Sequence, residues 1–138
     1  VSCSAPKQFY SERISRQPAF REIIEKAETM VAEGRGEELL SIAVGATPGI
    51  FSARTHLDKY GRDDRNDCRP YAKRIGCPLL AIVGSAEPKF FHDYAQELVA
   101  AAGTNSTYKL VDGGNHFYNR HTAEIIEIIY QWLAQFDR

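Results

Sequence analysis

Two side chains in the C-terminal half, Glu87 and His116, are of types that take part in acid–base chemistry. Glu87 stands in the segment GSAEP and His116 in the segment GGNHFY, and each segment directly follows a short apolar run. A carboxylate beside an imidazole fixes the tautomer of the ring and stabilises its protonated form. The pair therefore predicts acid–base chemistry, with His116 as the base and Glu87 as the residue that orients it.

The sequence around these two segments predicts a βαβα unit. The run CPLLAIVG is apolar throughout, which is typical of a buried parallel strand, here at residues 79–83. Apolar side chains at helical spacing predict a helix from Pro88 to Gly103, and the segment 107–111 predicts a second strand. A second apolar stripe predicts a helix over residues 123–136. Strands that alternate with helical crossovers are parallel.

The loops that leave such strands bring their side chains to one edge of the sheet. Glu87 and His116 are therefore expected to lie within reach of each other. The two glycines before His116 permit the turn that points its ring into a cleft. Phe117 and Tyr118 are expected to pack beneath the ring or to line the cleft as substrate-binding residues, and Asn115 to brace the loop by hydrogen bonds.

The N-terminal half predicts fewer elements. The opening VSCSAP is typical of the end of a short strand that runs into a loop, so the chain is expected to begin inside an element. Periodic apolar residues predict a helix over 18–33. A connection rich in glycine, proline and threonine follows at 45–50, and a short helix is predicted over 52–60. The polar segment 61–70 predicts a surface loop.

The C-terminal pattern resembles the α/β-hydrolase family. A strand that ends in G-x-x-acid-P, a helix, another strand, G-G-x-H-F and a terminal amphipathic helix resemble the last part of that fold over residues 70–137. The resemblance implies that Glu87 is the acid and His116 the base of a catalytic triad whose chain order is Ser, acid, His. It implies further that residues 6–61 correspond to the helical cap that is commonly inserted into the fold of these proteins.

The resemblance also sets the expected fold class and domain organisation. We expect a three-layer α/β protein with a partial parallel sheet, helices on both faces and a helical cap segment. Residues 1–138 form a single partial domain in this interpretation, with a cap-like or lid-like segment at 6–65 and the βαβα unit at 66–138.

One member of the triad is missing from the sequence. The nucleophile of this family sits in a G-x-S-x-G turn, and no such pentad occurs in the 138 residues. Ser2 and Ser4 lack flanking glycines, and Ser85 is followed by Ala, Glu and Pro. We therefore expect the C-terminal segment of a serine hydrolase that acts on a small-molecule ester or acyl substrate. Its partner would be a missing N-terminal half or another copy of the chain, and no cofactor is expected.

Composition and charge argue against several classes of binding partner. The net charge of −1 comes from interspersed acidic and basic residues, which argues against a nucleic-acid or membrane partner. No apolar run approaches the roughly 18 residues of a membrane span. Cys3, Cys68 and Cys77 are widely spaced and form no CxxC pair, so we expect structural or incidental thiols in a reducing cytoplasm and no metal site.

Alternative interpretations remain for the same residues. His116 could cap the last helix, and Glu87 could be a carboxylate favoured by a helix N-terminus. His56, His92 and His121 are expected to be ordinary exposed residues. For the chain as a whole, the alternative is an inert fragment or interaction module that oligomerises through an exposed strand edge. A flavodoxin-like binding domain is a weaker alternative, because the sequence GATPG lacks the G-K-[ST] ending of a phosphate loop.

Overall fold

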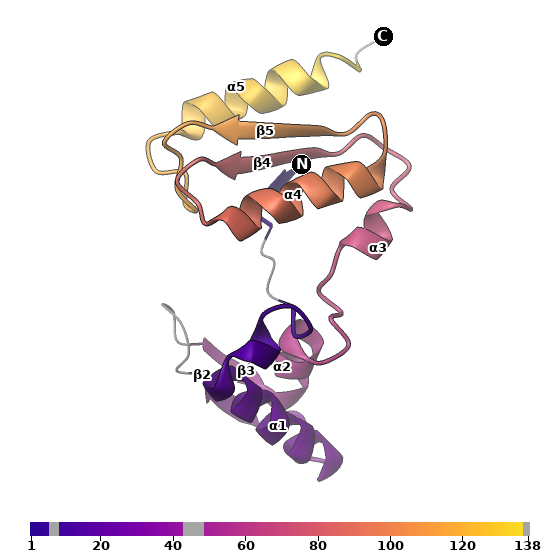
Figure 1. The fold of residues 1–138 in the computed structure, drawn as a ribbon, viewed down its shortest axis with the longest axis vertical. Coiled ribbons are helices and arrows are strands. Elements are labelled where there is room, and N and C mark those ends of the chain that lie inside the picture. The colour runs from indigo at the N-terminus through magenta and orange to yellow at the C-terminus, as the bar shows by residue number, and fades with distance from the viewer. Residues whose placement is uncertain (6–8, 43–48, 137–138) are drawn as a thin grey trace. The chain divides into compact units, whose positions relative to one another are not determined.

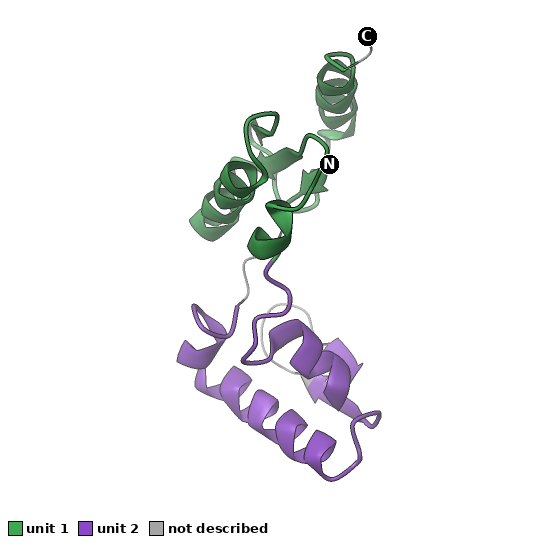
Figure 2. Cartoon of the chain, turned by 90° about the vertical axis from the view of Figure 1, so that its right-hand side faces the viewer, with its two compact units in different colours: residues 1–7, 68–138 green, residues 8–67 purple. Residues whose placement is uncertain are grey.

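The computed structural model describes residues 1–5, 9–42 and 49–136. The chain divides into two compact units, which Figure 2 distinguishes by colour. Unit 1 contains residues 1–7 and 68–138, and unit 2 contains residues 8–67. The beginning of the chain therefore belongs to the same unit as its C-terminal half.

Unit 1 is built on a three-stranded parallel sheet. Its strands are β1 (Ser2–Cys3), β4 (Leu80–Gly84) and β5 (Thr107–Val111), in the order β1-β4-β5. Ser2 is in register with Ala81, and Leu80 is in register with Thr107. Because all three strands are parallel, their carboxyl ends lie at one edge of the sheet.

Helices cover both faces of this sheet. Figure 1 shows β4 and β5 between α4 (Lys89–Ala102) and α5 (Thr122–Leu133). Alternate side chains of β4 serve the two faces, since Ala81 and Val83 pack with α4 residues whereas Leu80 and Ile82 pack with Trp132 of α5. Every residue of β4 is buried for this reason. A short helix, α3 (Arg69–Ala72), precedes β4.

The elements predicted for unit 1 are confirmed with small shifts at their ends. The strand predicted at 79–83 is β4, the strand at 107–111 is β5, and the two predicted helices are α4 and α5. The protein is a mixed α/β protein. None of the described helices is long and apolar enough to cross a membrane, and all three cysteines are exposed.

Unit 2 combines two helices with an antiparallel strand pair. The long helix α1 (Pro18–Ala32) begins at a proline and packs against α2 (Ala53–Tyr60), which Ser52 caps by accepting a hydrogen bond from the Thr55 amide. The strands β2 (Leu39–Ile42) and β3 (Gly49–Ser52) pair beside them, and a single 3-10 turn, η1 (Ile14–Arg16), precedes α1. Two apolar clusters form the core: Tyr10, Ile14, Phe20 and Ile24, and Ala27, Met30, Leu40 and Ala53.

Two features of unit 2 differ from the sequence-based expectations. The antiparallel pair is not predicted by the sequence pattern, and positions 45–48 of the predicted connection lie outside the described residues. The prediction that His56 is exposed is wrong. Its ring is fully buried, with Nε2 3.0 Å from the carbonyl oxygen of Leu40 and its plane edge-on to Phe51. His56 lies on the same face of α2 as the buried Ala53, so its position on the helix determines its burial although histidine is a polar residue.

The loops after β4 and β5 are held together by backbone contacts. The amide of Ser85 donates to the carbonyl of Val111 at 2.8 Å, and the amide of Ala86 donates to the carbonyl of Gly114 at 3.0 Å. Gly84 lies against Gly114 so closely that a Cβ atom on Gly84 would overlap the Gly114 carbonyl. Gly113 adopts a φ of 68°, which a glycine tolerates without strain. These glycines bring the two loops into contact.

The close approach yields a prediction for Gly84→Ala. The added methyl group has to displace the backbone of Gly114, so the free energy of unfolding should fall by about 3 kcal/mol, the upper end of the usual cost of overpacking. Chemical denaturation followed by circular dichroism measures this change. Gly76→Ala is the matched control, because no atom lies within 4 Å of the added carbon, and its effect should stay within about 1 kcal/mol. Equal effects of the two variants would contradict the contact.

Candidate functional site

Three chain segments deliver polar side chains to the carboxyl edge of the sheet of unit 1. Ser4 follows β1, Glu87 lies in the loop between β4 and α4, and His116 lies in the loop between β5 and α5. The arrowheads of β4 and β5 in Figure 1 mark this edge. The structure therefore brings together the two residues that the sequence singled out, and it adds a third.

Glu87 is the buried centre of this cluster. Only 1% of its side chain is exposed. Its Oε1 accepts hydrogen bonds from the Ser4 hydroxyl and, at 3.3 Å, from the Gly84 amide, and its Oε2 lies 3.0 Å from Nδ1 of His116. A buried carboxylate is costly unless such partners satisfy it. Both oxygens of Glu87 are thus engaged, and each faces a different direction.

His116 presents the opposite character, since half of its side chain is exposed. An ionised carboxylate can only accept, so the Nδ1 atom that faces Oε2 of Glu87 has to carry the proton. The ring lies beside Phe91 and Phe117, with centroids 5.1 and 5.5 Å away. Its Nε2 atom has no hydrogen-bond partner among the described residues. When the ring is neutral and Nδ1 carries the proton, Nε2 is therefore the unprotonated nitrogen.

The loop around His116 separates its two aromatic neighbours. Phe117 is 79% exposed, so it lies at the surface beside the imidazole. Tyr118 has a φ of 49° and turns inward, where its hydroxyl contacts the Ser4 hydroxyl and lies 3.0 Å from the carbonyl of Ile82. Asn115 accepts hydrogen bonds from the amides of Phe117 and Asn119, at 3.1 and 3.4 Å. Asn115 braces the loop, and Tyr118 supports the buried side of the cluster.

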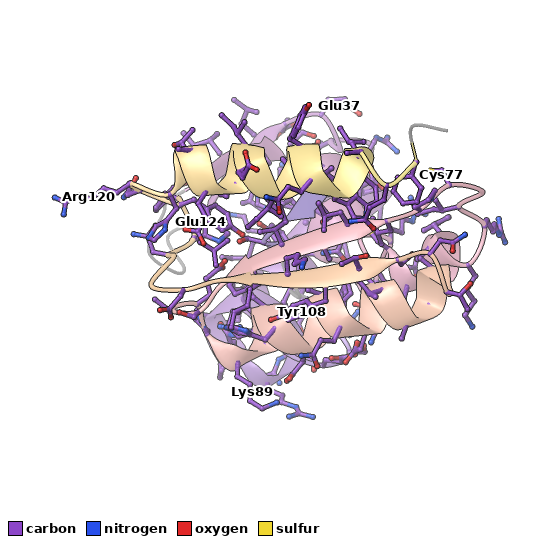
Figure 3. All side chains as sticks on the ribbon, turned by 90° about the horizontal axis from the view of Figure 1, so that it is seen from above. Glu37, Cys77, Lys89, Tyr108, Arg120 and Glu124 are labelled. Carbon is purple, nitrogen blue, oxygen red and sulfur yellow. The ribbon has the colours of Figure 1, made fainter. Side chains whose placement is uncertain are left out.

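A second histidine fixes the main chain of Glu87. Nε2 of His92, on α4, lies 3.0 Å from the carbonyl oxygen of Glu87, and its Nδ1 lies 3.2 Å from the hydroxyl of Tyr108. Figure 3 shows Tyr108 on the α4 side of β5. Since the Glu87 carbonyl can only accept, Nε2 carries the proton and Nδ1 accepts from Tyr108. His92 is partly buried and ties α4 and β5 to the loop of Glu87.

The buried carboxylate affects both neighbouring phenols. Burial is the main cause that raises the pKa of Tyr108 and of Tyr118 above the usual value of 10.0, and the negative charge of Glu87 raises both further. The hydrogen bond with Ser4 acts in the opposite direction on the pKa of Tyr118. Both phenols are therefore protonated at neutral pH and able to donate.

The alternative interpretations, His116 as a helix cap and Glu87 as a carboxylate at a helix N-terminus, do not account for the hydrogen bonds of these residues. The hydrogen bonds of Glu87 go to the ends of β1 and β4 and to the loop after β5, and the N-cap of α5 is His121. His121 instead lies 2.9 Å from Glu124 in a second, more exposed histidine–glutamate pair. Within the described part of the chain, no three His, Cys, Asp or Glu side chains gather as a metal site would require.

Ser4 is the residue of the candidate site that the sequence pattern does not single out, because it lacks the flanking glycines of a nucleophile turn. The sequence does contain a signal for Ser4, because the opening VSCSAP predicts the end of a strand. Loops that follow parallel strands meet at the carboxyl edge of the sheet, which places Ser4 beside Glu87 and His116. Its left-handed backbone, with a φ of 47°, has no signal in the sequence.

Comparisons with known proteins identify no relative: no family model, no curated protein and no solved structure matches the chain. The fold and the site define a mixed α/β protein in which a buried carboxylate pairs with a half-exposed imidazole at the carboxyl edge of a parallel sheet.

The raised pKa of Tyr118 predicts how stability depends on alkaline pH. A group whose pKa is higher in the folded state contributes stability that is complete below its unfolded pKa, near 10, and is lost as pH rises through the folded value. The free energy of unfolding should therefore fall above pH 10, and less steeply in Tyr118→Phe. Urea denaturation across that range measures both slopes. The control is Tyr71→Phe, at an exposed position, which should leave the slope unchanged.

Proposed function

We propose that unit 1 carries the acid and the base of a serine hydrolase of the α/β-hydrolase type, in which Glu87 orients His116. One observation carries the proposal: Oε2 of a buried glutamate lies 3.0 Å from Nδ1 of a half-exposed histidine, at the carboxyl edge of a parallel sheet. The chain order of acid before histidine agrees with the resemblance noted in the sequence.

The geometry suits a defined sequence of proton transfers. With Nδ1–H held by Glu87, Nε2 of His116 accepts the proton of a serine hydroxyl as its oxygen attacks the carbonyl carbon of an ester. Nε2 then returns that proton to the leaving alcohol, which leaves an acyl-enzyme. Water then attacks the acyl group while it gives a proton to Nε2, and that proton passes to the serine oxygen as the carboxylic acid leaves. Glu87 stays ionised and stabilises the imidazolium at each step.

Several parts of the reaction lie outside the 138 residues in this proposal. The nucleophilic serine and the amides that stabilise the oxyanion come from a missing N-terminal segment or from another chain, because the sequence contains no G-x-S-x-G pentad. The substrate is a small ester or acyl compound, and the exposed ring of Phe117 beside His116 offers it an apolar wall. The segment 6–65 takes the role of a cap that sets acyl or alcohol specificity.

The first prediction of this proposal concerns the 138-residue chain by itself. Without a nucleophile it should not turn over an activated aryl ester such as 4-nitrophenyl acetate above the rate of a matched His116→Ala variant. Release of 4-nitrophenol, followed by absorbance, measures this rate. Because an exposed imidazole can attack an activated ester by itself, the missing serine would be contradicted only by catalysis that disappears on His116→Ala and is also blocked by a serine-directed fluorophosphonate.

The same proposal makes a positive prediction for the product of the whole reading frame that encodes these residues. A fluorophosphonate probe should label one serine there, in a G-x-S-x-G turn. Ester turnover should fall by about four orders of magnitude in Glu87→Gln and by at least as much in His116→Ala. The exposed pair supplies matched controls, because His121→Ala and Glu124→Gln remove the same chemical groups and should leave turnover unchanged. A reading frame without such a serine, or control variants as inactive as the others, would contradict the proposal.

A second candidate function is an interaction module that associates through unit 1. Two observations favour it: β1 is an edge strand that pairs only with β4 among the described residues, and α5 presents an exposed apolar stripe at helical spacing. The stripe consists of Ile126, Tyr130 and Leu133, which are 62%, 70% and 50% exposed. An unpaired strand edge and an apolar stripe both favour association with another chain.

Association should therefore raise the mass of the chain in solution as its concentration rises. Multi-angle light scattering measures this mass, and Tyr130→Lys should lower it because the charge would have to be buried at the interface. Lys89→Ala, on the surface of α4, is the control and should leave the mass unchanged. A strict monomer whose amides at residues 1–5 are protected from hydrogen exchange would contradict this second function.

A further inference from the structure

The hydroxyl of Ser4 reaches Glu87 from a distant part of the chain. The two residues are 83 positions apart, and Ser4 is 5% exposed. Its amide donates to the carbonyl of Ile82 at 2.9 Å, which continues the parallel pairing of β1 with β4. Ser4 is therefore fixed to β4 through its main chain, and its side chain points at the carboxylate that follows the same strand.

The backbone of Ser4 gives a second reason to look for a role. Its φ of 47° lies in the left-handed region, where glycine is the favoured residue and a serine is strained. The sequence nevertheless has a residue with a hydroxyl at this position. Backbone conformation alone does not account for that choice, whereas the hydrogen bond from the hydroxyl to Oε1 of Glu87 does.

The protons of the cluster can be assigned one by one. When Glu87 is ionised, the Ser4 hydroxyl donates to Oε1, and the single hydroxyl proton of Tyr118 goes either to the Ser4 oxygen or to the Ile82 carbonyl at 3.0 Å. When Glu87 is protonated on Oε1, the chain reverses: Oε1–H donates to Ser4, Ser4 donates to Tyr118, and Tyr118 donates to the Ile82 carbonyl at 3.0 Å. The chain ends at a carbonyl, so it reorients protons and transfers none to solvent.

The same assignment excludes Ser4 as the nucleophile. Its hydroxyl binds Oε1 of Glu87, whereas His116 contacts the other oxygen, Oε2. A nucleophile has to give its proton to the base, and the proton of Ser4 is directed at the carboxylate instead. Ser4 acts on the histidine only through Glu87.

We infer, on the basis of the function proposed above, that Ser4 is a positioning residue that holds Glu87 with Oε1 turned inward and Oε2 turned toward His116, with Tyr118 supporting the Ser4 oxygen. Ser4 and the Gly84 amide together occupy Oε1. Oε2 is then the oxygen that remains for the imidazole. The N-terminal segment thereby completes a pair whose two members belong to the C-terminal half.

The tautomer of the His116 ring tests this inference in the 138-residue chain without any catalysis. The two ring nitrogens are distinguished by their ¹⁵N chemical shifts in a histidine-labelled sample at about pH 8, where an ordinary imidazole is neutral. The signals of His116 are those that disappear in His116→Ala. In the unaltered chain the Nδ1–H tautomer should dominate, because Glu87 accepts its proton.

Four variants separate the contributions. Glu87→Gln should lower the ratio of Nδ1–H to Nε2–H by on the order of tenfold, which corresponds to the loss of a hydrogen bond to a charged group. Ser4→Ala and Ser4→Gly should each lower it by roughly threefold, which corresponds to the loss of an uncharged one. Ser4→Gly keeps a residue that favours the left-handed backbone and removes only the hydroxyl. Ser2→Ala makes the same chemical change in β1, away from Glu87, and should leave the ratio unchanged.

The outcomes distinguish the two proposals. A ratio that falls in Glu87→Gln and stays unchanged in both Ser4 variants would overturn the role of Ser4 and leave the Glu87–His116 pair in place. A fall in Ser4→Ala with none in Ser4→Gly would assign the effect to the backbone and would also overturn the role of the hydroxyl. A ratio that does not change in Glu87→Gln would show that the pair is not formed in solution, and the proposed hydrolase function would fail with it.

Discussion

The burial of one carboxylate determines how this edge of the molecule is built. Only 1% of the Glu87 side chain is exposed, and a buried charge is costly unless donors surround it. The donors come from three places: the end of β1, the end of β4 and the loop after β5. The pair of Glu87 and His116 is therefore a property of the assembled sheet, and none of the three segments forms it alone.

The same requirement explains why the loops approach so closely. Glu87 and His116 meet only if the turn after β4 and the turn after β5 lie against each other, and the contact of Gly84 with Gly114 permits that distance. Side-chain bonds reinforce it, since the hydroxyl of Ser85 accepts from the Gly113 amide and donates to Asp112. His92 adds a further anchor from α4 to the main chain of Glu87. Each polar group at this edge thus limits the movement of the carboxylate from a different side.

The sequence predicted the elements of unit 1 better than those of unit 2, and the reason is physical. The strand β4 is buried on both faces and carries a continuous apolar run, and α4 and α5 carry long stripes at helical spacing. The pair β2–β3 has four-residue strands, which are too short to show a reliable alternation. Glu87 and His116 follow predicted strands and could be placed, whereas the contact of Ser4 depends on pairing across 83 positions and on a left-handed backbone.

The length of the glutamate side chain at position 87 allows its two oxygens to contact different partners, Oε1 with Ser4 and Gly84 and Oε2 with His116. The amide of Glu87 donates to the Gly84 carbonyl, and the carboxylate folds back so that Oε1 meets the Gly84 amide three residues earlier. Oε2 meanwhile spans the gap to the imidazole of the next loop. An aspartate, one methylene shorter, would pull the carboxylate toward its own turn, so that either Ser4 or His116 would lose its contact. Glutamate lets a single side chain join the ends of three strands, and the contact of Oε2 with Nδ1 of His116 leaves Nε2 of that ring without a hydrogen-bond partner among the described residues.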